Sequence, residues 1–86
     1  MSKHFNVLGF LANSFPQVAF KVVCSGAIAS TEIEIVGNDS RYSLFMVGTK
    51  MRFEVIGDNG IVDSIESSPH EDESHYAGRI VALIKG

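Results

Sequence analysis

The residues with the greatest capacity for chemistry lie between positions 70 and 75. His70 and His75 flank three consecutive acids, Glu71, Asp72 and Glu73. Imidazole and carboxylate groups can hold divalent cations. In a helix, however, the two histidines would lie about 500° apart around the axis, on faces that do not converge. We therefore predict no metal site and interpret this segment as an acidic, solvated start of a helix.

Cys24 is the only cysteine, so an intramolecular disulfide is excluded. A cysteine can act as a nucleophile beside a histidine, but a lone cysteine in an apolar run is more often a small core residue. The sequence contains no Gly-x-Ser-x-Gly elbow, no GxGxxG fingerprint and no P-loop. We predict that the protein is not an enzyme and binds no cofactor.

Composition sets the class of protein. The chain has 86 residues, of which 45% are hydrophobic, and a net charge of −3. This length predicts one domain, residues 1–86, and the apolar content is too high for disorder. Polar residues interrupt the apolar stretch after Lys3, which argues against a signal peptide and favours a cytoplasmic location. Because a small domain has little interior volume, we expect some apolar side chains to face a partner or a second copy.

The middle of the chain predicts antiparallel strands. Ile33 and Ile35 alternate with Glu32 and Glu34, which places the isoleucines inward and the glutamates in water. Turn-forming residues then separate three further runs: 42–47, 51–55 and 61–66. We expect residues 30–36 to form a hairpin with the first run, and the second run to form one with the third.

The two ends of the chain are less regular. Residues 4–12 predict a first strand. Residues 15–25 favour a helix from the spacing of their apolar side chains, although Phe20, Val22 and Cys24 alternate as in a strand. Ser68 predicts an N-cap with a capping-box glutamate three residues later, and residues 76–85 carry an apolar helical stripe, with a strand as the alternative.

These elements predict an α+β fold: a small two-layer sandwich with an antiparallel sheet of four to five strands and one or two helices on one face. Residues 48–55 and the turn at 57–60 resemble the late hairpin of cold-shock and other oligonucleotide-binding barrels. That resemblance implies an alternative, a small all-β barrel that binds single-stranded nucleic acid with Lys50, Arg52 and exposed aromatic side chains.

The order of elements is also similar to that of the bacterial phosphocarrier domain of sugar uptake systems, with a comparable helix start at residues 13–16. This similarity implies an open-faced sandwich. Asn13 and Phe15 occupy the positions where that family has its phosphorylated histidine and a neighbouring arginine. The resemblance therefore does not extend to phosphotransfer.

We expect a small non-catalytic binding or regulatory protein that acts through protein–protein contacts, as an inhibitor or adaptor of a larger machine or as a small phage-type effector. Its partner would be another protein, a second copy in a homodimer, or both. The acidic balance argues against nucleic acid as a partner, and we expect no membrane contact. The candidate partner-binding residues are Glu71, Asp72, Glu73, Tyr76 and Arg52.

Overall fold

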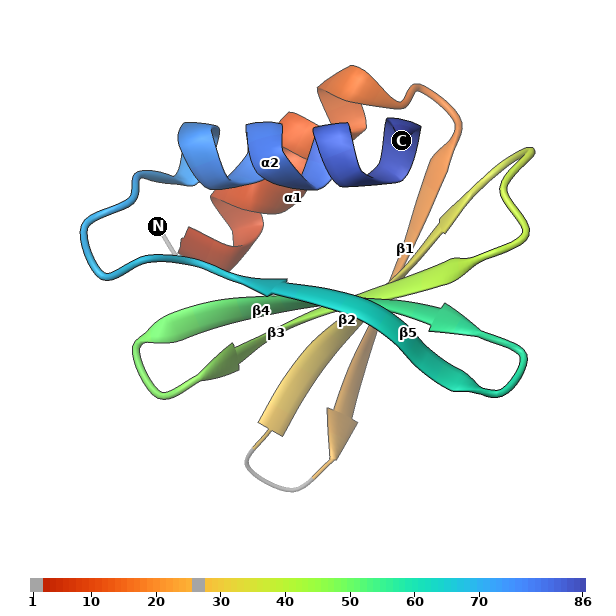
Figure 1. Cartoon of the computed structure of the whole chain (residues 1–86). Coiled ribbons are helices and arrows are strands. Elements are labelled where there is room, and N and C mark those ends of the chain that lie inside the picture. Colours follow the sequence, from red (N-terminus) through yellow and green to blue (C-terminus); the bar gives the residue numbers. More distant parts are fainter. Residues whose placement is uncertain (1–2, 26–27) are drawn as a thin grey trace.

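Along the chain, five strands follow a first helix and precede a second one in the computed structural model. The structure describes residues 3–25 and 28–86, and the side chains of residues 3–23 and 30–86. The elements are α1 (Lys3–Ser14), β1 (Val18–Ser25), β2 (Ile28–Ile35), β3 (Arg41–Val47), β4 (Lys50–Gly57), β5 (Gly60–Glu66) and α2 (Glu73–Lys85). The strands pair in sequence order, always antiparallel, and both helices cover one face of the sheet (Figure 1). The predicted α+β sandwich is confirmed, whereas the all-β barrel is wrong because β1 and β5 are the two edges of an open sheet.

The N-terminal segment is a helix, and the prediction of a strand over residues 4–12 is wrong. His4, Val7, Leu8 and Leu11 recur at i, i+3, i+4 and i+7, and the last three are buried. Phenylalanines at other positions on the helix hid this stripe, since their spacing and β propensity favoured a strand. Tertiary contacts of the apolar stripe therefore decide the conformation of α1.

Strand β1 replaces the helix favoured over residues 15–25. Its register runs from Val18 opposite Ile35 to Ser25 opposite Ile28, so it forms a hairpin with β2. The alternation of Phe20 and Val22 was the correct signal. It was weak because β1 is an edge strand whose two faces are both partly exposed, so that apolar residues occur on both.

Helix α2 confirms the helix over residues 76–85 but begins later than Ser68. Asp72 is its N-cap and accepts a hydrogen bond from the His75 N–H. The predicted capping-box contact exists one turn earlier, where the Glu71 carboxylate accepts from the Ser68 N–H at 2.9 Å. Ser68 and Glu71 therefore close a turn before the helix, and Asp72 takes the capping role.

The core lies between the helices and the sheet. Tyr42, Leu44 and Phe53 project from the central strands, and Tyr42 and Phe53 stack with ring centroids 5.5 Å apart. The predicted hairpins are confirmed: Thr31 pairs with Leu44, and β4 pairs with β5. The buried residues are Val7, Leu8, Leu11, Thr31, Ile33, Ile35, Tyr42, Leu44, Met51, Phe53, Ser67, Tyr76, Ala77 and Ile80.

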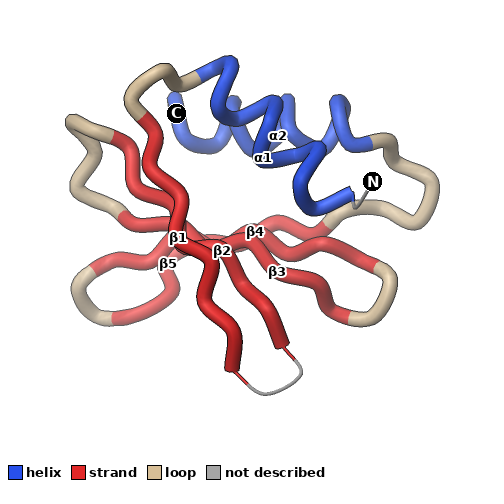
Figure 2. Tube along the Cα trace, turned by 180° about the vertical axis from the view of Figure 1, so that it is seen from behind, coloured by secondary structure: helices blue, strands red, loops and turns tan. Residues whose placement is uncertain are grey.

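The opposite face of the sheet has no helix over it (Figure 2). Along one row of this face, Lys21 lies opposite Glu32, and Ser43 lies opposite Glu54. Polar side chains suit a face in contact with water. Neither helix of the described chain has the length and apolar character needed to cross a membrane.

Candidate functional site

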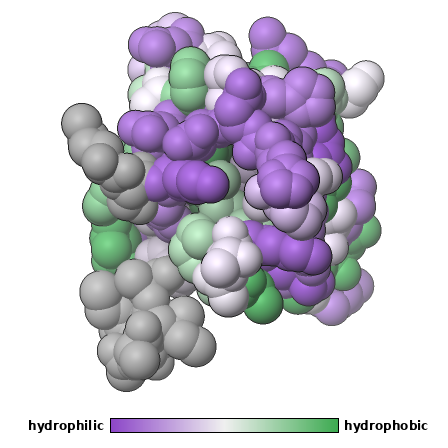
Figure 3. All heavy atoms as spheres, turned by 90° about the vertical axis from the view of Figure 1, so that its left-hand side faces the viewer, coloured by the Kyte–Doolittle hydropathy of each residue, from purple (hydrophilic) through white to green (hydrophobic). Residues whose placement is uncertain are grey.

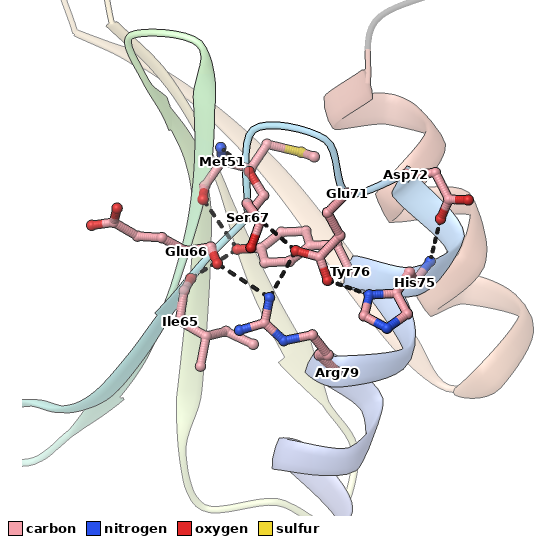
Figure 4. A network of polar contacts seen from close by, with 10 residues as sticks. Met51, Ile65, Glu66, Ser67, Glu71, Asp72, His75, Tyr76 and Arg79 are labelled. Atoms are coloured by element: carbon pink, nitrogen blue, oxygen red, sulfur yellow. Dashed lines mark hydrogen bonds and ion pairs between the residues drawn. The ribbon is translucent and has the colours of Figure 1, made fainter.

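Glu71 is the centre of a polar network at the start of α2 (Figure 4). Its side chain is only 5% exposed and contacts the His75 imidazole and the Arg79 guanidinium, the latter at 2.7 Å. Burial favours the neutral acid, but hydrogen bonds from Ser68, His75 and Arg79 outweigh it and lower the pKa of Glu71. The Glu71 carboxylate therefore makes its polar contacts within the chain. Hydrophilic residues predominate on the side of the molecule that carries this loop (Figure 3).

Tyr76 is fully buried beneath this network. Its hydroxyl donates to the Ile65 carbonyl at 2.8 Å and lies 3.3 Å from the Met51 carbonyl. Burial raises the pKa of Tyr76, so the phenol stays protonated and keeps its donor. Tyr76 joins α2 to β4 and β5 and presents no surface to a partner.

Asp72 and Glu73 are the predicted partner-binding acids that keep access to solvent. The pKa of Asp72 is lowered chiefly by the hydrogen bond from the His75 N–H, with a further one from the Ser74 hydroxyl. Glu73 lies 3.4 Å from the side-chain nitrogen of Asn6 on α1. Both acids therefore lie at the junction of the two helices.

Arg52 lies away from these acids, on the open face of the sheet. Its guanidinium contacts Glu54 at 3.1 Å and Glu66 at 3.3 Å. The structure thus brings Glu71, Asp72, Glu73 and Tyr76 together at one end of α2 and separates Arg52 from them. Arg52 is neutralised locally by two glutamates.

The other described side chains that could act in catalysis or metal binding do not form a cluster. Within the part of the chain that the structure describes, no group of three or more His, Cys, Asp or Glu side chains could hold a metal ion. His4 instead contacts the buried Thr31 hydroxyl at 2.7 Å, and burial lowers its pKa. The side chain of Cys24 lies outside the described residues.

A shallow groove of about 720 Å³ runs between α1 and the start of α2. Phe5 and Phe10 line it from α1, with 57% and 41% of their surface exposed. Asp72 and Glu73 line the opposite side. A second depression of about 250 Å³ continues it between the helices and shares Phe10 with it.

Gly9 also lines this groove, between Phe5 and Phe10 in the sequence. A Cβ added there would meet no atom within 4 Å, so the space above the backbone is open. The groove therefore combines an apolar wall, open space over Gly9 and an acidic rim. This arrangement can receive an apolar side chain together with a positive charge.

Sequence reasoning missed Phe5, Gly9 and Phe10. A signal for them exists: on a helix whose buried stripe is Val7, Leu8 and Leu11, two phenylalanines off the stripe must face outward. Recognising that signal requires the correct assignment of α1 as a helix.

Comparison of the chain with protein-family models, with curated proteins and with solved structures finds no significant match.

Proposed function

We propose that this is a non-catalytic cytoplasmic binding protein that acts by docking a segment of another protein in the groove between α1 and α2. The observation that carries the proposal is the exposure of Phe5 and Phe10 beside that groove. Aromatic side chains contribute more than most others to binding energy at protein interfaces. Two of them beside one depression give a partner an apolar anchor point.

The charge of the groove specifies the chemistry of the segment. Asp72 and Glu73 form an acidic rim, and the chain as a whole carries a net charge of −3. A segment with an apolar anchor and a nearby lysine or arginine would complement this surface, and opposite charges also accelerate encounter. The occupant we propose is therefore a basic amphipathic segment of a different protein, such as the target of an inhibitor or adaptor.

The open face of the sheet gives less support to a nucleic-acid function. On that face Glu32, Glu34 and Glu54 alternate with Lys21 and Arg41, and the contacts of Arg52 with Glu54 and Glu66 occupy its guanidinium. Binding of a phosphate backbone needs cations that are free to replace counterions. We therefore base the proposed function on the groove and not on the open face of the sheet.

Selection from a display library of random peptides on the immobilised protein tests this function. We expect enrichment of sequences with apolar residues at helical spacing and with lysine or arginine beside them. Phe5→Ala should weaken the binding of a selected peptide about thirtyfold, because loss of an aromatic hot spot costs about 2 kcal/mol. Glu73→Lys should weaken basic peptides as well.

The matched control is Val62→Ala, which removes an exposed apolar side chain, 66% exposed, from β5. It should leave peptide binding unchanged. A library that yields no enriched sequence, or a Val62→Ala effect as large as that of Phe5→Ala, would contradict the proposal. Titration with single-stranded oligonucleotides at low salt adds a further check, since tight binding there would favour the nucleic-acid alternative.

A further inference from the structure

The two edges of the sheet differ in how their outward backbone groups are satisfied. In β5, Ser67 pairs with Met51 through its N–H, so the backbone groups of Ser64 and Glu66 point away from β4. The Asp63 carboxylate accepts the Ser64 N–H at 2.8 Å, and Arg79 donates to the Glu66 carbonyl at 3.3 Å. Side chains of the same molecule thus occupy two of the four outward N–H and C=O groups of Ser64 and Glu66.

Strand β5 carries two further features that discourage pairing. The ladder between β4 and β5 is irregular at Val55 and Ile56. Asp63 lies opposite Val55, on the face of the sheet that the helices cover. Bulges and inward-pointing charges are the means by which natural proteins protect an edge strand.

Strand β1 has neither feature. The Gln17 carbonyl accepts from the Val36 N–H, which places the N–H and C=O groups of Phe20 and Val22 on the outer edge. Among the described residues, nothing beyond β1 hydrogen-bonds to those groups, and β2 is the only strand beside it (Figure 2). An unpaired edge at Phe20 and Val22, in a strand without proline, is a template for another strand.

The side chains along this edge are also apolar. Phe20 is 36% exposed and Val22 is 56% exposed, although both lie on the face of the sheet that carries the core. Lys21 is the only charged residue in β1 and projects from the opposite face. Pairing along β1 would remove Phe20 and Val22 from water while leaving Lys21 in it.

We propose that β1 pairs antiparallel with β1 of a second copy of this chain, so that two five-stranded sheets join across a two-fold axis. The strand fits itself, since every copy presents the same outward groups of Phe20 and Val22, and an isologous contact closes on itself. Lys21 restricts the register. A two-fold axis at Lys21 would place like charges directly opposite each other, whereas an axis at Phe20 or Val22 places Lys21 opposite Ala19 or Val23.

This dimer does not use the groove between the helices, so its test is independent of the test of the proposed function. Light scattering of the purified chain should give twice the monomer mass of 9.3 kDa. Val22→Lys should abolish the dimer, because it adds a charge to the pairing edge at an exposed position. Val62→Lys, on the protected strand, is the matched control and should leave the mass unchanged.

Amide hydrogen exchange provides a second measurement that does not depend on a variant. In the dimer, the N–H groups of Phe20 and Val22 should exchange slowly, and Val22→Lys should make the Phe20 amide exchange fast while core amides such as that of Leu44 stay protected. A monomeric mass together with fast exchange at Phe20 and Val22 would overturn the proposal. An equal loss of the dimer in Val62→Lys would also overturn it.

The register can be tested by cross-linking in a Cys24→Ser background. Phe20→Cys or Val22→Cys should form an intermolecular disulfide, whichever of the two residues lies on the axis. Efficient cross-linking at position 21 alone would contradict the assigned register.

Discussion

Helices α1 and α2 lie side by side on the same face of the sheet and have 12 and 13 residues, but they are held in different ways. Both ends of α2 are capped: the Asp72 side chain caps its start, and the backbone N–H of Gly86, at φ +81°, donates to the Ala82 carbonyl at its end. Glu73 and Lys85 complement its dipole. The local sequence thus supports α2 as a helix.

Helix α1 has no acid in its first turn and no base in its last turn. It depends on the burial of Val7, Leu8 and Leu11 against the sheet and α2, and on the contact between His4 and Thr31. The comparison teaches that one helix is specified locally and the other by the rest of the fold. Three predictions test the contacts and the helix propensities that hold these two helices.

The largest effect is expected from Tyr76→Phe. This substitution removes the hydroxyl that donates to the Ile65 carbonyl, and since that carbonyl keeps its ladder partner Phe53, the cost in the free energy of unfolding should be about 0.5–1.5 kcal/mol, that of one hydrogen bond. Tyr42→Phe is the control: Tyr42 is also buried, but its hydroxyl accepts from the side chain of Asn38, in the turn after β2. Urea unfolding should show a smaller loss of stability for Tyr42→Phe than for Tyr76→Phe. Equal losses would contradict the role assigned to the Tyr76 hydroxyl.

A smaller, pH-dependent effect is expected from Glu71→Gln. Since the folded protein lowers the pKa of Glu71 below its ordinary value of 4.5, the ionised group stabilises the fold above that pH, and this contribution is lost as the pH falls through the lowered pKa. The difference in stability between wild type and variant should therefore be greatest near neutral pH and shrink in acid. Thermal unfolding of wild type and variant across this range measures it.

The smallest effect is expected from Gly9→Ala in α1 and Gly78→Ala in α2. Neither glycine has an atom within 4 Å of an added Cβ, and neither has a positive φ. Each substitution should raise the free energy of unfolding by up to about 1 kcal/mol, the difference in helix propensity between the two residues. Chemical denaturation would test this, and a loss of stability in either variant would show that the helix is packed more closely than the structure indicates.

Prediction from sequence succeeded where a signal is local. Strands β2 to β5 follow from alternation such as that of Ile33 and Ile35 with glutamates, and α2 follows from its acidic start and apolar stripe. It failed at α1 and β1, where Phe5 and Phe10 gave a false β signal and both faces of an edge strand carry apolar residues. The groove could not be predicted, because it forms only when two helices come together that are separated by all five strands, α1 ending at Ser14 and α2 beginning at Glu73.

The docking of α2 against α1 also sets a limit on when the protein can fold during its synthesis. The meander of β1 to β5 can form progressively as it leaves the ribosome, since each strand pairs with the one made just before it. The buried surfaces of Val7 and Leu11 have no complete cover until Tyr76 and Ile80 have emerged. Although α1 precedes every strand in the sequence, it is thus among the last elements to be completely covered.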